Sequence, residues 1–391
     1  MIERHDGSLR IEGAVIGAGQ GVFDLILDGG RIAAIAPSGV AARTLCLPPL
    51  ADLHLHACRA FLGAGPPVAG LGEAVKQVQA RLADYGPADY ARHAARLYGR
   101  ARGHGTTRMR THADVDARVG LDAVLGSLQA REAVDAAVEV VAFVTARGDP
   151  AGAEEQAMLR DAVAQGATMI GAALDFVVDA GRAIDALLDL AGELDVGVDV
   201  HLDEHLDPGR SHSRRFAEAV SARALPDVTI SHACAVGALE APERSRAIDA
   251  FLAAGVTVIA LPATNLFLQD RAGGAAARRG ITCVAELLAA GVPLRFASDN
   301  VRDPFYPLGD GDLLDVAAMA MTGVPLADEA ALVAGICDGR ATLSAGDPAD
   351  LVLVPAASFA EALATRPAGR TVLRGGRPLP SAPAQETCHA C

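Results

Sequence analysis

The sequence predicts an α/β protein, a (β/α)8 TIM barrel with a small β-sandwich domain built from both chain ends. Three observations lead to this prediction. Short apolar segments alternate with stretches of helical composition through the middle of the chain, histidines and acidic residues stand where several of these segments end, and glycine-punctuated strands occupy both chain ends. A chain of 391 residues is long enough for a barrel and one small accessory domain.

The two chain ends carry similar short strand patterns. Glycine-rich turns interrupt apolar runs between Leu9 and Ile35, and residues 349–376 show the same character. Because chain termini commonly lie near each other, we expect the two ends to pair into one sheet domain. The predicted domains are residues 1–47 with 342–391 for the small β domain and residues 48–341 for the barrel.

Eight near-continuous apolar segments fill the middle of the chain, separated by Ala-, Leu- and Glu-rich stretches of helical composition. Strands buried on both faces of a parallel sheet have this character, and helical crossovers join such strands. His54 and Asp299 are 245 residues apart, close to the roughly 250 residues of a TIM barrel. No Gly-x-Gly-x-x-Gly turn follows the first segment, so an open doubly wound sheet is less well supported. The segments are residues 48–57, 106–112, 138–145, 168–174, 196–203, 228–232, 256–261 and 292–299.

Composition and charge exclude several classes of protein. A formal net charge of −14 at pH 7, without a basic stripe, argues against binding to nucleic acid. The first residues lack a cationic segment followed by an apolar run, and no stretch is long enough to cross a bilayer, so we expect a cytoplasmic protein without membrane contact. Seven scattered cysteines fit reduced thiols, and we interpret the terminal pair Cys388 and Cys391 as frayed chain rather than a metal site.

A histidine pair ends the first apolar segment. His54 and His56 are two residues apart, so the period of a strand directs both imidazoles to one side. His201, His232 and Asp299 end the fifth, sixth and eighth segments. Because TIM-barrel enzymes carry their chemistry at the carboxyl ends of the strands, we expect these five side chains to meet at the barrel mouth.

The types of these residues indicate the kind of metal. Three imidazole nitrogens and one carboxylate oxygen suit zinc or ferrous iron, whereas calcium and magnesium prefer oxygen. Either ion would lower the pKa of bound water, to about 7 for catalytic zinc, and so provide a nucleophile for hydrolysis. The only lysine, Lys76, lies between the first and second segments and not at the end of the fourth, which excludes a pair of ions bridged by a carboxylated lysine. We therefore expect one divalent ion per chain.

Two carboxylates follow His201 and are candidates for a proton shuttle. Strict strand geometry favours Asp203, which shares a face with His201, whereas Glu204 points inward only if the strand has already ended. The geometry leaves this choice open. Both could also be solvated loop acids.

Several motifs are specific when taken together: Asp52-Leu53-His54-Leu55-His56 and residues 105–115, 198–204, 231–232, 265–271, 279–282 and 299–309. On these motifs, the chain resembles the amidohydrolase superfamily and, within it, the bacterial cytosine deaminase group. The resemblance implies that His54, His56, His201 and Asp299 bind the metal, that Glu204 shuttles protons, that His232 orients or polarises the attacking water, and that Asp299 also acts as a base. It also implies iron or zinc as the metal and is compatible with a homo-oligomer.

The chain departs from the cytosine deaminase pattern around the substrate. The glutamine that reads the pyrimidine after the third strand is missing from residues 142–148, where Thr145 and Arg147 stand, and Asn300 replaces an aspartate. Gln269 and Phe305 still suit a flat nitrogen heterocycle, through hydrogen bonding and stacking, although either could be wall packing. His112 and Arg110 end the second segment, and a structural role beneath the site is our first interpretation of His112.

These features predict a metal-dependent hydrolase that deaminates a small, cytosine-like amino-substituted nitrogen heterocycle and releases ammonia. The alternative on the same mononuclear metal site is hydrolysis of a cyclic amide or of an N-alkylamino triazine. A non-catalytic metal-binding or ligand-binding barrel is a weaker alternative, because Glu204 and His232 exceed what binding requires. The expected partner is a small heterocyclic substrate.

Overall fold

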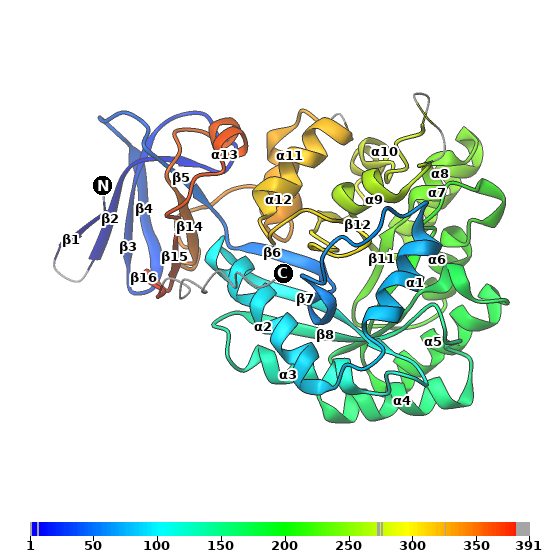
Figure 1. Ribbon diagram of the computed structural model, residues 1–391. Helices are drawn as coiled ribbons and strands as arrows, with labels where there is room; N and C mark the ends of the chain where they lie inside the picture. The colour runs from blue at the N-terminus through cyan, green and yellow to red at the C-terminus, as the bar shows by residue number, and fades with distance from the viewer. Residues whose placement is uncertain (1, 6–7, 272–273, 275–276, 325, 381–391) are drawn as a thin grey trace.

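The computed structural model describes residues 2–5, 8–271, 274, 277–324 and 326–380, which form a barrel and a smaller sheet beside it (Figure 1). The barrel strands are all parallel and follow one another in chain order around the sheet. Each predicted segment overlaps one of them, which confirms the (β/α)8 fold. The strands are β6 (Leu50–Leu55), β7 (Thr106–Val115), β8 (Ala137–Val144), β9 (Met169–Ala172), β10 (Gly197–Leu202), β11 (Val228–His232), β12 (Thr257–Ala260) and β13 (Leu294–Phe296).

The first and last strands meet just beyond β13. Leu55 and Asp299 form an isolated parallel bridge, and the Asp299 backbone N–H donates to the His54 carbonyl at 2.8 Å. The seam of the barrel therefore brings the His54–His56 segment and Asp299 side by side, although they are far apart in the sequence.

Helices surround the barrel because each has one apolar face to bury. In α5 (Ala180–Leu194), Ala183, Leu187 and Leu190 recur at helical spacing and are buried. The helix begins where the Asp179 carboxylate accepts from the Arg182 backbone N–H. The other α-helices of the barrel are α1 (Leu71–Arg81), α2 (Pro87–Gly103), α3 (Asp122–Arg131), α4 (Ala153–Gln165), α6 (Ser213–Ser221), α7 (Cys234–Ala238), α8 (Ala241–Ala254), α9 (Pro262–Leu268), α10 (Val284–Ala290), α11 (Leu313–Gly323) and α12 (Glu329–Ile336). The 3-10 helices are η1 (Ala57–Arg59), η2 (Leu174–Phe176) and η3 (Pro208–Arg210).

Helix α1 is an addition to the regular barrel. The glycine- and proline-rich stretch after the first strand is a loop only as far as Gly70, and α1 begins at Leu71. Helix α2 then makes the crossover to β7. Ala74 and Val78 bury the inner side of α1, which leaves this helix as one wall of the pocket described below.

Both chain ends build the smaller sheet, as the sequence predicts. Strand β5 runs parallel to β2 and antiparallel to β14, and so joins the N-terminal strands to the C-terminal ones. An isolated bridge between Arg31 and Pro348 links β4 to the start of β14, so the layers belong to one curled sheet around an apolar core. The strands are β1 (Ile2–His5), β2 (Ser8–Ile16), β3 (Phe23–Asp28), β4 (Arg31–Pro37), β5 (Thr44–Leu47), β14 (Leu351–Val354), β15 (Thr371–Arg374) and β16 (Arg377–Pro378), with helix α13 (Phe359–Thr365) between β14 and β15.

The turn between β3 and β4 shows how local sequence sets this sheet. Gly29 and Gly30 have φ of 54° and 76°, and Asp28 pairs with Arg31 across a two-residue loop. Left-handed backbone at both positions matches the twist of the flanking strands and favours glycine.

None of the helices in the described part of the chain is long and apolar enough to cross a bilayer. Cys388 and Cys391, whose pairing the sequence raised, lie outside the described residues.

Candidate active site

The predicted metal ligands meet at the mouth of the barrel. Asp299 Oδ1 lies 3.6 Å from His54 Nε2 and 3.3 Å from His56 Nε2. The His201 ring lies 4.6 Å from the His54 ring and 5.0 Å from the His56 ring, measured between centroids. Four side chains from β6, β10 and the segment after β13 therefore surround one small volume.

Several polar atoms of these side chains have no hydrogen-bond partner. They are His54 Nε2, both ring nitrogens of His56, His201 Nε2 and both carboxylate oxygens of Asp299, all buried. Burial lowers the pKa of His54, His56 and His201 well below the usual value, so the imidazoles are neutral. Neutral nitrogens and a carboxylate that converge without partners fit a divalent cation, which would satisfy them together.

The orientation of His54 is set from the opposite side of its ring. Ser231 Oγ donates to Asp199 Oδ1 at 3.1 Å, so it accepts the 2.8 Å hydrogen bond from His54 Nδ1. The proton of neutral His54 therefore sits on Nδ1, and Nε2 presents its lone pair to the metal position.

Asp199 also connects the mouth to the interior of the barrel. His112 Nε2 lies 3.2 Å from Asp199 Oδ1, and Arg110 Nη1 donates to Asp199 Oδ2 at 3.1 Å. The His112 ring lies 4.1 Å from the His54 ring and belongs to the same potential ligand group as His54, His56 and His201. His112 thus lies within the site itself and not beneath it, whereas Arg110 occupies the supporting position.

The structure separates the two carboxylates that follow His201. Asp203 accepts hydrogen bonds from Ser211 Oγ and the His212 backbone N–H, so it holds the following loop. Glu204 instead faces the site, with Oε2 3.6 Å from His232 Nε2 and 4.0 Å from His201 Nδ1. Burial raises the pKa of Glu204 well above its ordinary value, and the charges of Asp299 and Asp175 raise it further.

His232 approaches the same volume from β11. Asn265 Nδ2 donates to His232 Nδ1 at 3.0 Å, so the proton of the neutral ring lies on Nε2, toward Glu204. Burial lowers the pKa of His232 to about 4, which keeps this tautomer neutral near pH 7. His232 and Asp299 have φ of 74° and 59°, a left-handed backbone that non-glycine residues rarely adopt. Strain of this kind gathers at functional sites.

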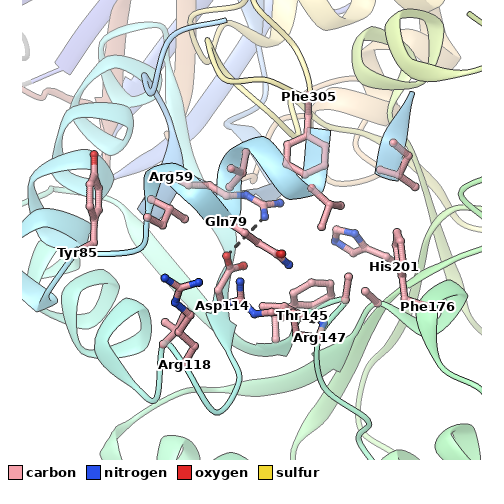
Figure 2. A pocket seen from close by; sticks show the side chains of 18 of the residues that line it. Arg59, Gln79, Tyr85, Asp114, Arg118, Thr145, Arg147, Phe176, His201 and Phe305 are labelled. Carbon is pink, nitrogen blue, oxygen red and sulfur yellow. Dashed lines mark hydrogen bonds and ion pairs between the residues drawn. The ribbon is translucent and has the colours of Figure 1, made fainter. Parts of the chain in front are cut away.

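A pocket opens beside His201 and Glu204 (Figure 2). Helix α1 forms one wall of it. Of the predicted substrate contacts, Thr145, Arg147 and Phe305 line this pocket. Arg147 forms a 2.6 Å ion pair with Asp116, which also accepts from Thr145 Oγ1 at 2.6 Å.

Comparison with known proteins gives the family. The model of the amidohydrolase family matches residues 127–380, which is more than half of the chain. The chain belongs to the amidohydrolase family. A pterin deaminase from Rhizobium rhizogenes (strain K84) is 30% identical to this amidohydrolase over 90% of the chain and 87% of the relative. The 5-methylcytosine deaminase of Klebsiella pneumoniae, solved with 5-fluorocytosine, superimposes with a TM-score of 0.84 at 26% identity, covering 95% of this chain and 97% of the other.

A third relative has a different leaving group. The N-isopropylammelide isopropyl amidohydrolase of Pseudomonas sp. (strain ADP) is 26% identical over 70% of this chain and 69% of the relative. The predicted membership of the amidohydrolase superfamily is therefore confirmed. Members of this family use a metal site, and the histidine-rich group at the mouth of this amidohydrolase fits one.

Two predicted substrate contacts of the amidohydrolase have other partners. Gln269 Nε2 donates to the Glu204 backbone carbonyl at 2.9 Å, and Asn300 Nδ2 donates to Asp303 Oδ2 at 2.8 Å. Neither lines the pocket beside His201. Gln269 instead supports the loop that carries Glu204, and Asn300 supports the loop that carries Phe305.

Sequence reasoning missed several residues of the amidohydrolase site. Asp199 precedes His201 by two residues and Asp114 follows His112 by two, so strand periodicity alone could have placed both carboxylates on the inner side. Arg59, three residues after His56, also lines the pocket. Asp175, in the loop after β9, accepts from the Glu204 backbone N–H, in the loop after β10, at 2.6 Å. No local sequence pattern predicts this contact.

Proposed function

We propose that this amidohydrolase hydrolytically deaminates a small amino-substituted nitrogen heterocycle at a single divalent ion, zinc or iron, held by His54, His56, His201 and Asp299. One observation carries the proposal. Buried ring nitrogens and carboxylate oxygens without hydrogen-bond partners converge beside a pocket that also contains Glu204. When bound, such an ion would polarise water and make a strong nucleophile available near neutral pH.

Glu204 supplies the first proton. Burial raises its pKa well above the ordinary value, which favours the protonated form, and this form donates to the ring nitrogen next to the carbon that bears the amino group. The ring carbon becomes more electrophilic as a result. Asp299 accepts one proton of the attacking water, and neutral His232 donates a hydrogen bond from Nε2–H toward that water.

The atoms balance as a hydrolysis. Water adds to the ring carbon, the C–N bond to the amino group breaks, a carbonyl forms in its place, and ammonia leaves with protons passed on by Glu204 and Asp299.

The relatives act on rings of more than one size. Deaminases of pterin and of 5-methylcytosine are both among them, so bicyclic and monocyclic rings are both candidate substrates. The similarity to the N-isopropylammelide enzyme supports a second candidate, removal of an alkylamine from a triazine ring. Both reactions use the same water and the same proton transfers.

Ammonia release from the metal-loaded protein tests the proposal. The panel is cytosine, 5-methylcytosine, isocytosine, pterin, guanine and N-isopropylammelide, assayed for ammonia and for isopropylamine. We expect ammonia from at least one aminated ring, whereas isopropylamine alone would transfer the assignment to the second candidate. If neither amine forms from any compound, this substrate class is wrong.

Metal analysis tests the site separately. We expect about one zinc or iron per chain, lost on substitution of His56 by alanine. Two ions per chain would contradict the mononuclear site.

A further inference from the structure

Two buried charged residues line the pocket without a part in the proposed proton transfers. Arg59 ends η1, three residues after His56, and Asp114 lies on β7, two residues after His112. Their exposures are only 9% and 4%, and both line the pocket together with His201 and Glu204. Figure 2 shows them facing each other beneath Phe305.

The Arg59–Asp114 pair is not saturated. Arg59 Nη1 and Asp114 Oδ2 are 3.6 Å apart, too far for a hydrogen bond, and Arg59 Nε and Asp114 Oδ1 have no hydrogen-bond partner. Buried polar atoms are nearly always hydrogen-bonded, because leaving one unpaired is costly. This pair can therefore bind a ligand that offers both a hydrogen-bond donor and a hydrogen-bond acceptor.

A second ion pair, whose Arg147 also lines the pocket, shows the contrast. Arg147 and Asp116 are 2.6 Å apart, and Asp116 accepts further hydrogen bonds from Thr145 Oγ1 and from the backbone N–H groups of Arg118 and Val119. The protein itself therefore satisfies the Asp116 carboxylate. Arg147 thus belongs to a closed pair, whereas Arg59 and Asp114 form an open pair with hydrogen-bonding capacity for a ligand.

The chemistry of the open pair defines an edge of the ligand. A guanidinium donates and a carboxylate accepts, so side by side they complement a ring N–H next to a ring carbonyl, which is a lactam edge. The Arg59 guanidinium also lies 4.8 Å from the Phe305 ring centroid, which places a flat aromatic surface beside that edge. We propose that Arg59 and Asp114 bind the lactam edge of the substrate ring, with Arg59 donating to the carbonyl oxygen and Asp114 accepting from the ring N–H.

This inference rests on the proposed function for the reacting carbon and adds the substrate class. It selects oxo-substituted amino heterocycles, of which isocytosine and pterin are examples. In such a 2-amino-4-oxo ring, the amino carbon lies between two ring nitrogens. Glu204 protonates one of them and the lactam N–H is the other, so recognition and proton transfer use opposite sides of the same carbon.

Matched ligands test the inference without turnover. Isocytosine and pterin are compared with 2-amino-4-methoxypyrimidine and 2-amino-4-methoxypteridine, in which O-methylation removes the N–H and turns the carbonyl into an ether. Binding is measured by calorimetry on metal-loaded Glu204→Gln protein, so that the probes are not consumed. We expect the lactam rings to bind about 10-fold or more tightly than their methoxy partners.

Two variants in that background identify the residues responsible. Asp114→Asn can turn an amide N–H toward the ring nitrogen lone pair of the methoxy ligand, so the preference is expected to shrink or reverse. Arg59→Met removes the donor to the carbonyl and is expected to lower affinity for the lactam rings while leaving the methoxy rings nearly unchanged.

A buried ion pair outside the pocket provides the control. Arg370 and Asp312 lie 2.6 Å apart, almost fully buried, and Arg370→Met is expected to lower stability without changing the ligand preference. Equal binding of both ring types, binding of neither, or equal loss of both in the Asp114 and Arg59 variants would overturn the inference. Lactam-selective binding without ammonia release would instead count against the proposed function alone.

Discussion

The barrel contains two buried polar clusters with opposite properties. At the mouth, buried polar atoms face one another without hydrogen-bond partners. They belong to His54, His56, His201 and Asp299. Deeper in the barrel, Arg110 donates to Glu139 at 2.9 Å, to Asp199 at 3.1 Å, to Asp227 at 2.6 Å and to Thr229 at 2.9 Å. The polar atoms of the first cluster lack hydrogen-bond partners, so we call this cluster incomplete. The Arg110 guanidinium in the second cluster is hydrogen-bonded on all sides, so we call that cluster complete.

The incomplete cluster points to a function, whereas the complete cluster contributes to the stability of the same barrel. Buried polar atoms without partners cost folding free energy, so a protein keeps them only where another species satisfies them. A saturated network around one arginine needs nothing from outside. Asp199 belongs to both clusters, since it binds Arg110 on one side and Ser231 and His112 on the other. The complete cluster therefore holds the incomplete one in position.

The strongest test of the mouth cluster is Glu204→Gln. The amide keeps the shape but cannot carry the transferred proton, so kcat should fall by about 10²–10⁴-fold with the metal content unchanged. Steady-state ammonia release and elemental analysis measure the two quantities. Glu218→Gln, at an exposed position of α6, is the matched control and should keep full activity. Normal turnover in Glu204→Gln would remove this residue from the mechanism.

The complete cluster should respond through stability. Arg110→Met leaves Asp199 buried without its guanidinium, and we expect the free energy of unfolding to fall by about 3–5 kcal/mol. Urea denaturation measures it. Arg92→Met breaks the exposed pair with Asp89 and should change stability by less than about 1 kcal/mol. Equal effects of the two substitutions would mean that the buried Arg110 network stabilises the fold no more than an exposed ion pair does.

Ser231 tests the link between the clusters. Ser231→Ala removes the acceptor that fixes the His54 tautomer, and the affinity for zinc should fall by about 10–100-fold. Competition with a chelator gives the affinity. Ser127→Ala, which deletes a buried hydroxyl on α3, should leave it unchanged. An unaltered affinity in Ser231→Ala would show that Asp199 does not act on the metal site through Ser231.

Asp310 shows how a satisfied carboxylate outside both clusters behaves with pH. Burial alone would raise its pKa, but hydrogen bonds from His104 and Arg100 outweigh burial and lower the pKa to about 2. A lowered folded-state pKa adds stability above the unfolded value of about 4, and this stability is lost as pH falls from about 4 to 2. The lowered pKa of Asp310 contributes about 2 kcal/mol to the free energy of unfolding above this window. Asp310→Asn should flatten the pH dependence of unfolding in that window, and an unchanged slope would contradict the assignment.

The fold and the first residues of the site were open to prediction because their signals are local. Apolar runs with helical spacers specify parallel strands, and histidines at strand ends must then face the mouth. The choice between Asp203 and Glu204 was not local. It depends on β10 ending at Leu202 and on the left-handed backbone of Asp203, which directs that carboxylate to the following loop.

The substrate contacts were also harder to predict, because they depend on interactions between residues that are not adjacent in the sequence. Gln269 and Asn300 have suitable side chains, but each bonds to a neighbouring loop instead of lining the pocket. Arg59 and Asp114 come from different strand ends and meet only because β6 and β7 are neighbours in the barrel.

By itself, the sequence determined the (β/α)8 class, the pairing of the chain ends and the residue types of a metal-dependent hydrolase, since periodicity and strand-end position are properties of short segments. Tertiary structure alone decided which buried polar atoms are satisfied. Hydrogen bonding between distant strands completes the shell of Arg110 and leaves those of His56, Asp299 and Asp114 open. These unpaired atoms, which no single segment encodes, mark where we propose that this amidohydrolase binds its metal and its substrate.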